Sequence, residues 1–284
     1  MSGPSFSAVS IPDIAYREID GARLHLDLHR PETSEPAPVV VYFHGGAWEV
    51  GERTDLLKTR MLPLVRRGIA VASVEYRLTG AAAFPAQLLD ARAAVAWLRG
   101  RGGEFGLLTE RIGAWGSSAG GHLAALLGLE SPLAADGGPG AVPHAPLVSA
   151  VAAWNAPLDL DARCSRSWLE EAEDPAARGS EAALLGAPAY DPCDPRHRAA
   201  NPIALVTAAA APMQFVTGDR DRMVDPAESF RMHDALVRER VESAVAVVGG
   251  AGHEDLALDE APTIDFTAAF FRRHLLGERE RGGA

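Results

Sequence analysis

A serine framed by glycines is the first group in this chain that could do chemistry. The segment Gly116-Ser117-Ser118-Ala119-Gly120 follows the apolar residues 112–115 and precedes small apolar residues that favour a helix. In such a strand–turn–helix segment, glycines two positions to either side allow a sharp turn that lifts the serine hydroxyl away from the backbone. The pattern predicts Ser118 as a nucleophile, whereas Ser117 is out of register.

A glycine-rich loop, His44-Gly45-Gly46-Ala47-Trp48, follows an early β-branched segment and could stabilise negative charge. When a serine attacks an acyl carbon, charge develops on the former carbonyl oxygen, and preorganised backbone N–H groups stabilise it. We expect Gly46 and Ala47 to supply such donors, and Ala119 to supply another from the first turn of the helix after the serine. The loop histidine, His44, precedes the serine in the chain and is expected to shape the loop rather than act as a base.

Aspartates and a histidine follow the last two predicted strands, in the chain order nucleophile, acid, base. We expect His253 to take the Ser118 proton, since imidazole exchanges protons near neutral pH. Asp221 is expected to orient that imidazole and to stabilise its charged form. Asp219 and Asp225 are the rival acids, and each could instead order the turn or cap the helix that follows.

Two tryptophans and one serine could border a substrate pocket beside these groups. Trp48 ends the glycine-rich loop, Trp154 ends a predicted strand at the same rim, and Ser117 adjoins the nucleophile. We therefore expect Trp48, Trp154 and Ser117 in or near the pocket. Bulky rings close to the nucleophile favour small or medium acyl groups over long chains.

Alternating strand and helix patterns provide the scaffold for these loops. Short runs that are apolar throughout indicate strands covered on both faces, as in a parallel sheet, and amphipathic segments between them indicate helices. Alternating segments on either side of Asp20-Gly21 predict an antiparallel hairpin. The pattern predicts an α/β fold with a doubly wound, mostly parallel sheet. The expected strands are residues 14–19, 22–28, 39–43, 69–74, 112–115, 147–151, 213–216 and 244–248, and the expected helices are 85–99, 119–129, 227–240 and 264–276.

Residues 156–211 interrupt this alternation. They carry no strand pattern, are rich in Pro, Asp, Arg and Ala, and show short helical patterns near 167–173 and 180–185. Because unstructured loops of that length are rare in compact domains, we expect a partly helical cap inserted over the strand ends. Residues 1–284 then form one domain with this insertion, and residues 134–146 are expected to form a shorter flexible loop.

Composition excludes several classes of function. The chain carries 27 basic and 38 acidic side chains, a net charge of −11, which argues against a nucleic-acid partner. Lysine occurs once, at Lys58, so Schiff-base chemistry is nearly excluded. No metal-binding, dinucleotide-binding or phosphate-loop motif is present, and neither a metal nor another cofactor is expected.

The sequence also bears on location. No apolar stretch approaches the roughly 20 residues of a membrane span, and the first residues lack the pattern of a signal peptide. Cys164 and Cys193 are too few for a disulfide framework and are expected to be reduced thiols. We therefore expect a soluble, cytoplasmic protein without membrane contact. The oligomeric state is left open, with a homodimer among the alternatives.

These motifs resemble those of one enzyme family. Over roughly residues 38–275, the chain resembles α/β-hydrolase esterases with an HGG-x-W loop, the BD-FAE-like and hormone-sensitive-lipase-like carboxylesterases. Ser117 stands where hormone-sensitive-lipase-like members usually have Asp, and Ala47 takes a variable position; both favour the BD-FAE-like side. Besides the glycine-rich loop and the serine turn, the resemblance rests on Tyr76-Arg77-Leu78, Phe84-Pro85-Ala86, Asp90, Gly121, Asn201-Pro202-Ile203, Gly218-Asp219-Arg220-Asp221 and Gly252-His253.

The resemblance implies an α/β-hydrolase fold, a mostly parallel sheet of about eight strands flanked by helices with a small, mostly helical cap. It implies a serine hydrolase that cleaves small-molecule carboxylic esters of small or medium acyl chain through an acyl-serine, with Ser118, Asp221 and His253 as the triad. BD-FAE-like members include acetylesterases, feruloyl esterases and kynurenine formamidases, so the substrate stays open. An acyltransferase, a thioesterase or cyclase, and an arylformamidase-type amidase are alternatives with the same triad. A ligand-binding protein that has lost catalysis is a distant alternative.

Overall fold

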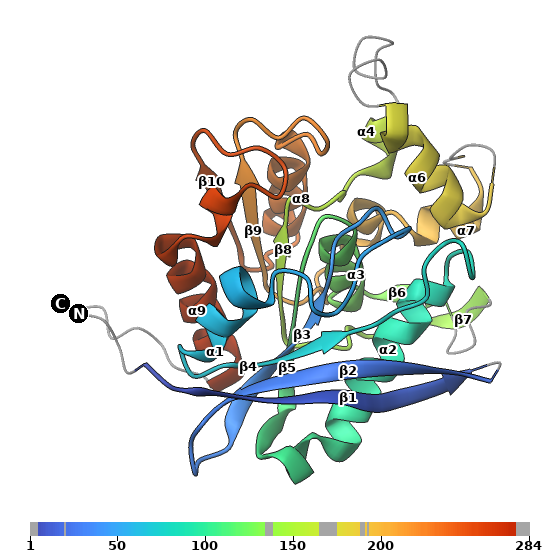
Figure 1. Cartoon of the computed structure of the whole chain (residues 1–284). Coiled ribbons are helices and arrows are strands. Elements are labelled where there is room, and N and C mark those ends of the chain that lie inside the picture. The colour runs from blue at the N-terminus through green and yellow to red at the C-terminus, as the bar shows by residue number, and fades with distance from the viewer. Residues whose placement is uncertain are drawn as a thin grey trace.

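The computed structural model describes residues 5–19, 21–133, 139–164, 175–187, 191 and 193–276. Eight of its strands form one sheet, and β6 (Ser131–Leu133) and β7 (Pro139–His144) form a separate pair (Figure 1). The predicted eight-stranded, mostly parallel sheet is confirmed. In spatial order it contains β1 (Ala8–Ile19), β2 (Ala22–Pro31), β4 (Ala70–Val74), β3 (Ala37–Phe43), β5 (Leu107–Ser117), β8 (Ala150–Trp154), β9 (Met213–Gly218) and β10 (Ser243–Val248).

The first two strands form the antiparallel hairpin that the alternating pattern predicted. They pair from Ala8 opposite Pro31 to Ile19 opposite Ala22, so both strands extend beyond their predicted ends. β2 pairs antiparallel with β4, and the pairings from β4 through β10 are parallel. The hairpin thus extends one side of the parallel sheet.

Helices cover both faces of the sheet, as its fully buried central strands require. One face packs against α2 (Ala86–Arg101), α3 (Ala119–Leu127) and α8 (Ala227–Arg238), and the other against α1 (Leu62–Val65) and α9 (Ala261–Leu276) (Figure 1). Leu88, Leu123 and Met232 belong to the first core, whereas Leu64 and Phe271 belong to the second. The predicted helices are therefore confirmed, with small shifts of their ends.

The register of the parallel strands brings the loops of interest to one edge of the sheet. Phe43 at the end of β3 lies opposite Gly116 of β5, and Val248 at the end of β10 lies opposite Gly218 of β9. Because the carboxyl ends of parallel strands share an edge, the segments that follow these strands are neighbours in space. Short 3-10 helices occur at η2 (Gly102–Phe105), η3 (Pro202–Leu205) and η4 (Leu256–Asp259).

Close backbone contacts explain two of the glycines around the serine turn. A Cβ atom on Gly120 would lie 2.0 Å from the carbonyl oxygen of Phe43, at the end of the neighbouring strand. A Cβ on Gly116 would lie 2.4 Å from the backbone of Gly120 itself. Both distances are far shorter than any tolerated contact, so the turn between β5 and α3 can form only without these side chains.

Two local predictions differ from the structure. β8 begins at Ala150, three residues later than predicted, because pairing with β5 starts at Gly113 opposite Ala150. The loop expected over 134–146 contains β7, which pairs antiparallel with β6 although its Pro and Gly residues are poor strand formers. Antiparallel pairing supplies the backbone hydrogen bonds that local sequence preference does not reveal. Residues 134–138 lie outside the described part of the chain.

A helical segment before β4 was not predicted at all. It begins as a π-helix, η1 (Leu57–Met61), and continues as α1. Pro63 interrupts the helical pattern of the sequence, yet it stands in the first turn of α1, where the missing N–H costs nothing. This segment carries Arg60, whose side chain is completely buried.

The regular elements among the described residues of 156–211 are all helices. They include α4 (Leu160–Cys164), α6 (Pro175–Leu185) and α7 (Pro195–Ala199), together with η3 (Figure 1). The predicted helical segment at 180–185 lies within α6, whereas the one at 167–173 lies outside the described residues. That this insertion covers the site as a cap stays a prediction.

The base of the insertion is tied to the sheet domain by buried acceptors. The Glu228 carboxylate on α8 accepts the N–H groups of Leu158 and Asp159, at 2.8 and 3.0 Å. The backbone N–H of Ile203 donates to the carbonyl of Leu158, at 3.0 Å. The two ends of the insertion are therefore bonded to each other and to α8.

Two helical glycines offer a matched test of the packing around the serine turn. We expect Gly120→Ala to lower the free energy of unfolding by about 3 kcal/mol or more, because its Cβ meets rigid backbone. Gly100→Ala, in α2 with open space around its Cα, should raise it by about 0.5 kcal/mol. Urea denaturation followed by circular dichroism measures both. Equal changes in the free energy of unfolding for the two variants would show that the close backbone contact at Gly120 does not exclude a side chain.

Candidate active site

The serine turn places Ser118 in a strained and accessible position. Its backbone has φ 51° and ψ −126°, a combination that non-glycine residues rarely adopt. The Ser118 N–H donates to the carbonyl of Trp154 at 2.8 Å, which fixes the turn to the end of β8. Ser118 is partly exposed, whereas Ser117 before it and Ala119 after it are buried. The hydroxyl of Ser118 is thus the one of this pair that a ligand can reach.

Ser118, His253 and Asp221 form one hydrogen-bonded chain. The His253 Nε2 atom lies 2.9 Å from the Ser118 Oγ atom, and His253 Nδ1 lies 2.8 Å from Asp221 Oδ2. The Asp221 side chain is fully buried and that of His253 is 9% exposed. With Nδ1–H donating to the carboxylate, Nε2 is left as the acceptor of the serine O–H. This geometry suits a nucleophile, a base and an orienting acid.

The structure separates the three rival aspartates by their partners. Asp221 uses its second oxygen, Oδ1, to accept the N–H groups of Met223 and Val224, each at 2.9 Å, which fixes the carboxylate. Asp219 accepts the Gly250 N–H at 2.6 Å, and Asp225 caps the start of α8. Of the three, Asp221 alone bonds the histidine, and the other two have the structural roles considered above.

The glycine-rich loop is held in an unusual backbone conformation. Gly46 has φ +108°, and a Cβ there would lie 2.2 Å from the Val50 carbonyl oxygen. Ala47 and Trp48 follow with φ values of 55° and 60°. The N–H groups of Glu49 and Val50 close the loop on the Gly46 carbonyl. This reversal leaves the N–H groups of Gly46 and Ala47 without an acceptor among the described residues.

Those two donors, with a third from α3, are the groups expected to hold an oxyanion. Ala119 is the first residue of α3, so its N–H lacks an intrahelical acceptor and lies at the positive end of the helix. Gly45, next to Gly46, lies against the nucleophile, since a Cβ on Gly45 would be 3.3 Å from the Ser118 Cβ. The oxyanion roles of Gly46, Ala47 and Ala119 stay predictions.

His44 has the loop-shaping surroundings that were expected. Its side chain is buried and its Nδ1 lies 2.7 Å from the Gly45 carbonyl oxygen. The Tyr76 ring stacks on it at 4.4 Å, and the Tyr76 hydroxyl donates to the His44 carbonyl at 2.9 Å. Burial lowers the pKa of His44, so the ring favours its neutral form. Gly51 makes room for it, since a Cβ there would lie 2.3 Å from His44 Nδ1.

The side chains proposed to border a pocket all lie in packing contacts. Trp48 meets the His122 ring edge-on at 5.1 Å, and Trp154 meets Trp115 at 5.3 Å. The Ser117 hydroxyl lies 3.4 Å from that of Tyr42. Trp48 is 2% exposed, and Trp154 and Ser117 are fully buried. Their contact with a substrate stays a prediction.

The sequence patterns missed a buried ionic cluster beside the site. Arg60 pairs with Glu254 at 2.9 Å and with Asp259 at 2.5 Å. The available signal was the position of Glu254 directly after His253. Its partner could not be found, because the helical segment that carries Arg60 was itself not predicted.

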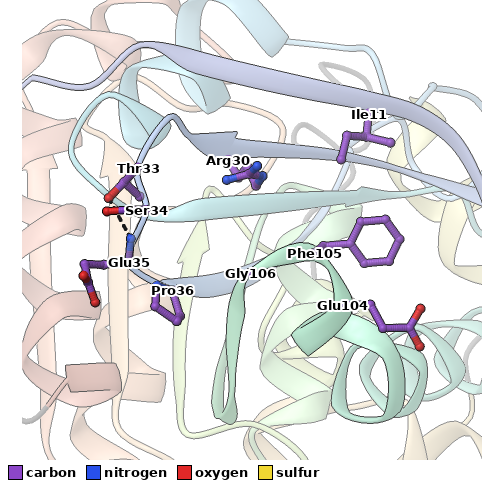
Figure 2. A pocket seen from close by; sticks show the side chains of 9 residues that line it. All are labelled: Ile11, Arg30, Thr33, Ser34, Glu35, Pro36, Glu104, Phe105 and Gly106. Atoms are coloured by element: carbon purple, nitrogen blue, oxygen red, sulfur yellow. Dashed lines mark hydrogen bonds between the residues drawn. The ribbon is translucent and has the colours of Figure 1, made fainter.

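One cavity in the structure lies away from Ser118. Its volume is about 320 Å³, and Arg30 and Phe105 are among the residues that line it (Figure 2). Ile11, the segment 33–36, Glu104 and Gly106 complete its lining, so it lies where β3 and β5 begin rather than where they end. It is therefore on the opposite edge of the sheet from the triad.

Neither a metal-binding cluster nor a membrane-spanning helix occurs in the part of the chain that the structure describes. Among the described residues, no group of three or more His, Cys, Asp or Glu side chains could hold a metal ion. Over the same ranges, no helix combines the length and apolar character needed to cross a bilayer. Cys193 is a free, exposed thiol, and the side chain of Cys164 lies outside the described part.

The sequence is similar to one family and to named esterases. The model of the family described as BD-FAE matches residues 26–236. The chain is 30% identical over 240 residues to Esterase LipC of Mycobacterium tuberculosis. That match covers 81% of this chain and 56% of LipC, so the chain spans little more than half the length of this relative.

Solved structures share the fold at lower identity. A truncated carbohydrate esterase from gut microbiota has a TM-score of 0.75 at 21% identity, covering 97% of this chain and 99% of its own. Est2, a thermophilic esterase of Thermogutta terrifontis solved with propionate, has a TM-score of 0.71 at 22% identity, covering 94% and 93%. Together with the sheet order, this likeness confirms the expected α/β-hydrolase fold.

The aspartate assignment can be tested by the reactivity of the serine. We expect Asp221→Asn to slow the labelling of Ser118 by a fluorophosphonate about 10³- to 10⁴-fold, because an amide no longer stabilises the imidazolium. Asp219→Asn and Asp225→Asn should stay within about threefold of the unsubstituted protein, since they lose only a turn or cap contact. Mass spectrometry measures the rates. Slow labelling in either of these two controls, with Asp221→Asn unaffected, would reassign the acid.

Proposed function

The chain belongs to the BD-FAE family, and on that premise we propose that it is a serine carboxylesterase for small-molecule esters. The hydrogen-bonded chain from Ser118 through His253 to Asp221 is the single observation that carries the proposal. The glycine-rich loop beside Ser118 supports it, as does the similarity to LipC. The ester would be cleaved through an acyl-serine intermediate.

The first half of the reaction forms the acyl-enzyme. His253 Nε2 takes the proton of the Ser118 hydroxyl while Oγ attacks the acyl carbon and the carbonyl π electrons move onto oxygen. Asp221 stabilises the imidazolium and, held by two backbone N–H groups, cannot rotate away from it. When the C–O bond to the leaving group breaks, His253 returns its proton to the departing alcohol.

The tetrahedral intermediate needs donors for its negative oxygen. We assign them to the N–H groups of Gly46 and Ala47 in the glycine-rich loop and of Ala119 at the start of α3. One such donor is worth about 3 kcal/mol of transition-state stabilisation in a comparable site. The positive φ of Gly46 fixes the loop before substrate arrives, so this stabilisation does not require loop rearrangement.

The second half of the reaction repeats the first with water. His253 takes a proton from a water molecule, hydroxide attacks the acyl carbon, and the same donors hold the second oxyanion. The acid leaves as Ser118 recovers its proton. If another alcohol, thiol or amine replaced water, the same site would perform acyl transfer, and cleavage of a formamide would make it an amidase.

The acyl group is proposed to be small or medium in size. The insertion at 156–211 follows β8 directly at the edge of the sheet that carries Ser118, and we assign it the role of a cap over the acyl pocket. Trp48, beside the loop, would bound the same pocket. Est2 of Thermogutta terrifontis, which shares the fold, was solved with propionate, a short acyl product.

A cytoplasmic location is the remaining expectation, and the oligomeric state is open, with a homodimer as one alternative. The free thiol of Cys193 supports a reducing compartment, where exposed thiols persist. Light scattering on the purified protein decides between monomer and dimer. Fractionation of cells that express the full-length gene decides the location.

Removing the nucleophile tests the proposed mechanism. We expect Ser118→Ala to lower kcat for p-nitrophenyl butyrate by about 10⁴-fold or more, with the melting temperature unchanged because alanine keeps the Cβ and therefore the same backbone requirements at this turn. Ser34→Ala, at an exposed position far from the triad, is the matched serine control and should keep full activity. Persistence of hydrolysis in Ser118→Ala would refute the assignment.

An acyl-chain series tests the proposed size of the pocket. For p-nitrophenyl acetate, butyrate, octanoate and palmitate, we expect kcat/KM to be highest for acetate or butyrate and at least about tenfold lower for palmitate, since a capped pocket excludes long chains. A maximum at palmitate would contradict a small acyl pocket. Product analysis with added alcohol or amine acceptors, and turnover of formyl-kynurenine, separates hydrolysis from acyl transfer and amidase activity.

A further inference from the structure

Arg60 provides a completely buried positive charge close to the candidate site. Its Nη1 atom lies 2.9 Å from Glu254 Oε2, and its Nε atom lies 2.5 Å from Asp259 Oδ1. The guanidinium also lies over the Trp154 ring, 4.9 Å from the ring centre. One rigid group therefore contacts two carboxylates and an aromatic ring at the same time.

The two carboxylates bracket the segment that follows the candidate base. Glu254 is the residue after His253, and Asp259 ends the 3-10 helix η4. Glu254 has φ +52°, a left-handed conformation that an unconstrained glutamate disfavours. The pairing with Arg60 holds Glu254 in this conformation and anchors both ends of the segment to one point.

The same cluster reaches the oxyanion loop and the serine turn. A Cβ on Gly45 would lie 3.1 Å from Glu254 Oε1, so this carboxylate packs directly against the glycine-rich loop. Trp154, which lies under the guanidinium, accepts the Ser118 N–H through its carbonyl oxygen. Arg60 thus contacts Glu254, which adjoins His253 and packs on the glycine-rich loop, and Trp154, which is hydrogen-bonded to Ser118.

The charge of Arg60 is secured by its partners. Burial opposes ionisation, but the neighbouring Tyr42, Glu254 and Asp259 together raise the pKa of Arg60 above its ordinary value. Arg60 is therefore positively charged around neutral pH. A buried ion pair contributes little net stability compared with apolar packing, so its consequence here is fixed geometry.

We propose that Arg60, acting through Glu254, is a positioning residue that holds His253 and the oxyanion loop in register with Ser118. The proposal rests on the proposed esterase function, since the groups that Arg60 would position are those of the esterase site. It assigns Arg60 no contact with substrate. Loss of the pairing would let Glu254 leave its left-handed conformation and would move His253 relative to the Ser118 hydroxyl. A displacement of about 1 Å at such a site can cost about a hundredfold in rate.

The test uses the full-length chain with substitutions on both sides of the pair. Glu254→Ala removes the contact, whereas Glu254→Gln keeps a hydrogen-bond acceptor for Arg60, and the Glu254 side chain is 27% exposed and so tolerates change. Arg60→Lys keeps the charge but loses the fork that joins both carboxylates. Arg67→Lys is the control, since Arg67 makes a similar pair with Asp265 at the surface near α1.

If Arg60 positions His253 through Glu254, breaking the pair should lower kcat and leave KM nearly unchanged. We expect kcat for p-nitrophenyl butyrate to fall about 30- to 100-fold in Glu254→Ala and in Arg60→Lys, with KM within about threefold and partial recovery in Glu254→Gln. Arg67→Lys should match the unsubstituted enzyme. The low-field proton resonance of the His253 Nδ1–H bonded to Asp221 should broaden or vanish in the first two variants, while circular dichroism stays unchanged.

Three outcomes decide whether Arg60 and Glu254 position His253 and whether the proposed esterase function holds. If Glu254→Ala folds, keeps the low-field resonance and turns over within about twofold of the unsubstituted enzyme, the positioning role is wrong. If Arg60→Lys does not fold, the two Glu254 variants still decide. Failure of the proposed function has a different signature, because the unsubstituted protein would then hydrolyse no ester, while the resonance would still report whether Arg60 and Glu254 hold His253.

Discussion

The backbone of α3 passes so close to the end of β3 that no side chain fits between them. The Gly120 Cα faces the carbonyl oxygens of Phe43 and His44, and this contact sets the serine turn directly against the glycine-rich loop. Because both segments are continuous with strands in the same parallel register, their separation is fixed by the sheet rather than by flexible side chains. This contact places Ser118 beside the loop that carries Gly46 and Ala47, the proposed oxyanion donors. The turns that carry Asp221 and His253 are then added from β9 and β10 at the same edge.

Much of this arrangement could be predicted from the sequence. The apolar runs that became β3, β5, β9 and β10 placed each chemistry-bearing turn at the end of a parallel strand, and that inference needs only local patterns. Asp221 could also be ranked above its neighbours, although the deciding fact is a hydrogen bond to a residue far along the chain.

Other features depend on long-range contacts that local patterns do not encode. β7 forms from Pro- and Gly-containing residues because β6 lies beside it, and β8 begins later than predicted because its register is set by β5. In the cluster around Arg60, Glu254 and Asp259 lie 194 and 199 positions further along the chain. A buried arginine looks like a surface residue in the sequence until the chain is folded around it.

The insertion after β8 is a long segment whose two ends lie side by side next to the sheet. Near its two ends, the Ile203 N–H donates to the Leu158 carbonyl oxygen. The Glu228 carboxylate on α8 accepts the Leu158 N–H. The length and composition of the insertion are thus uncoupled from the sheet register, since closing a longer loop between fixed ends adds little entropy cost. The segment between these two residues can therefore change in length and sequence while the parallel sheet and the turns that carry Ser118, Asp221 and His253 keep the same geometry.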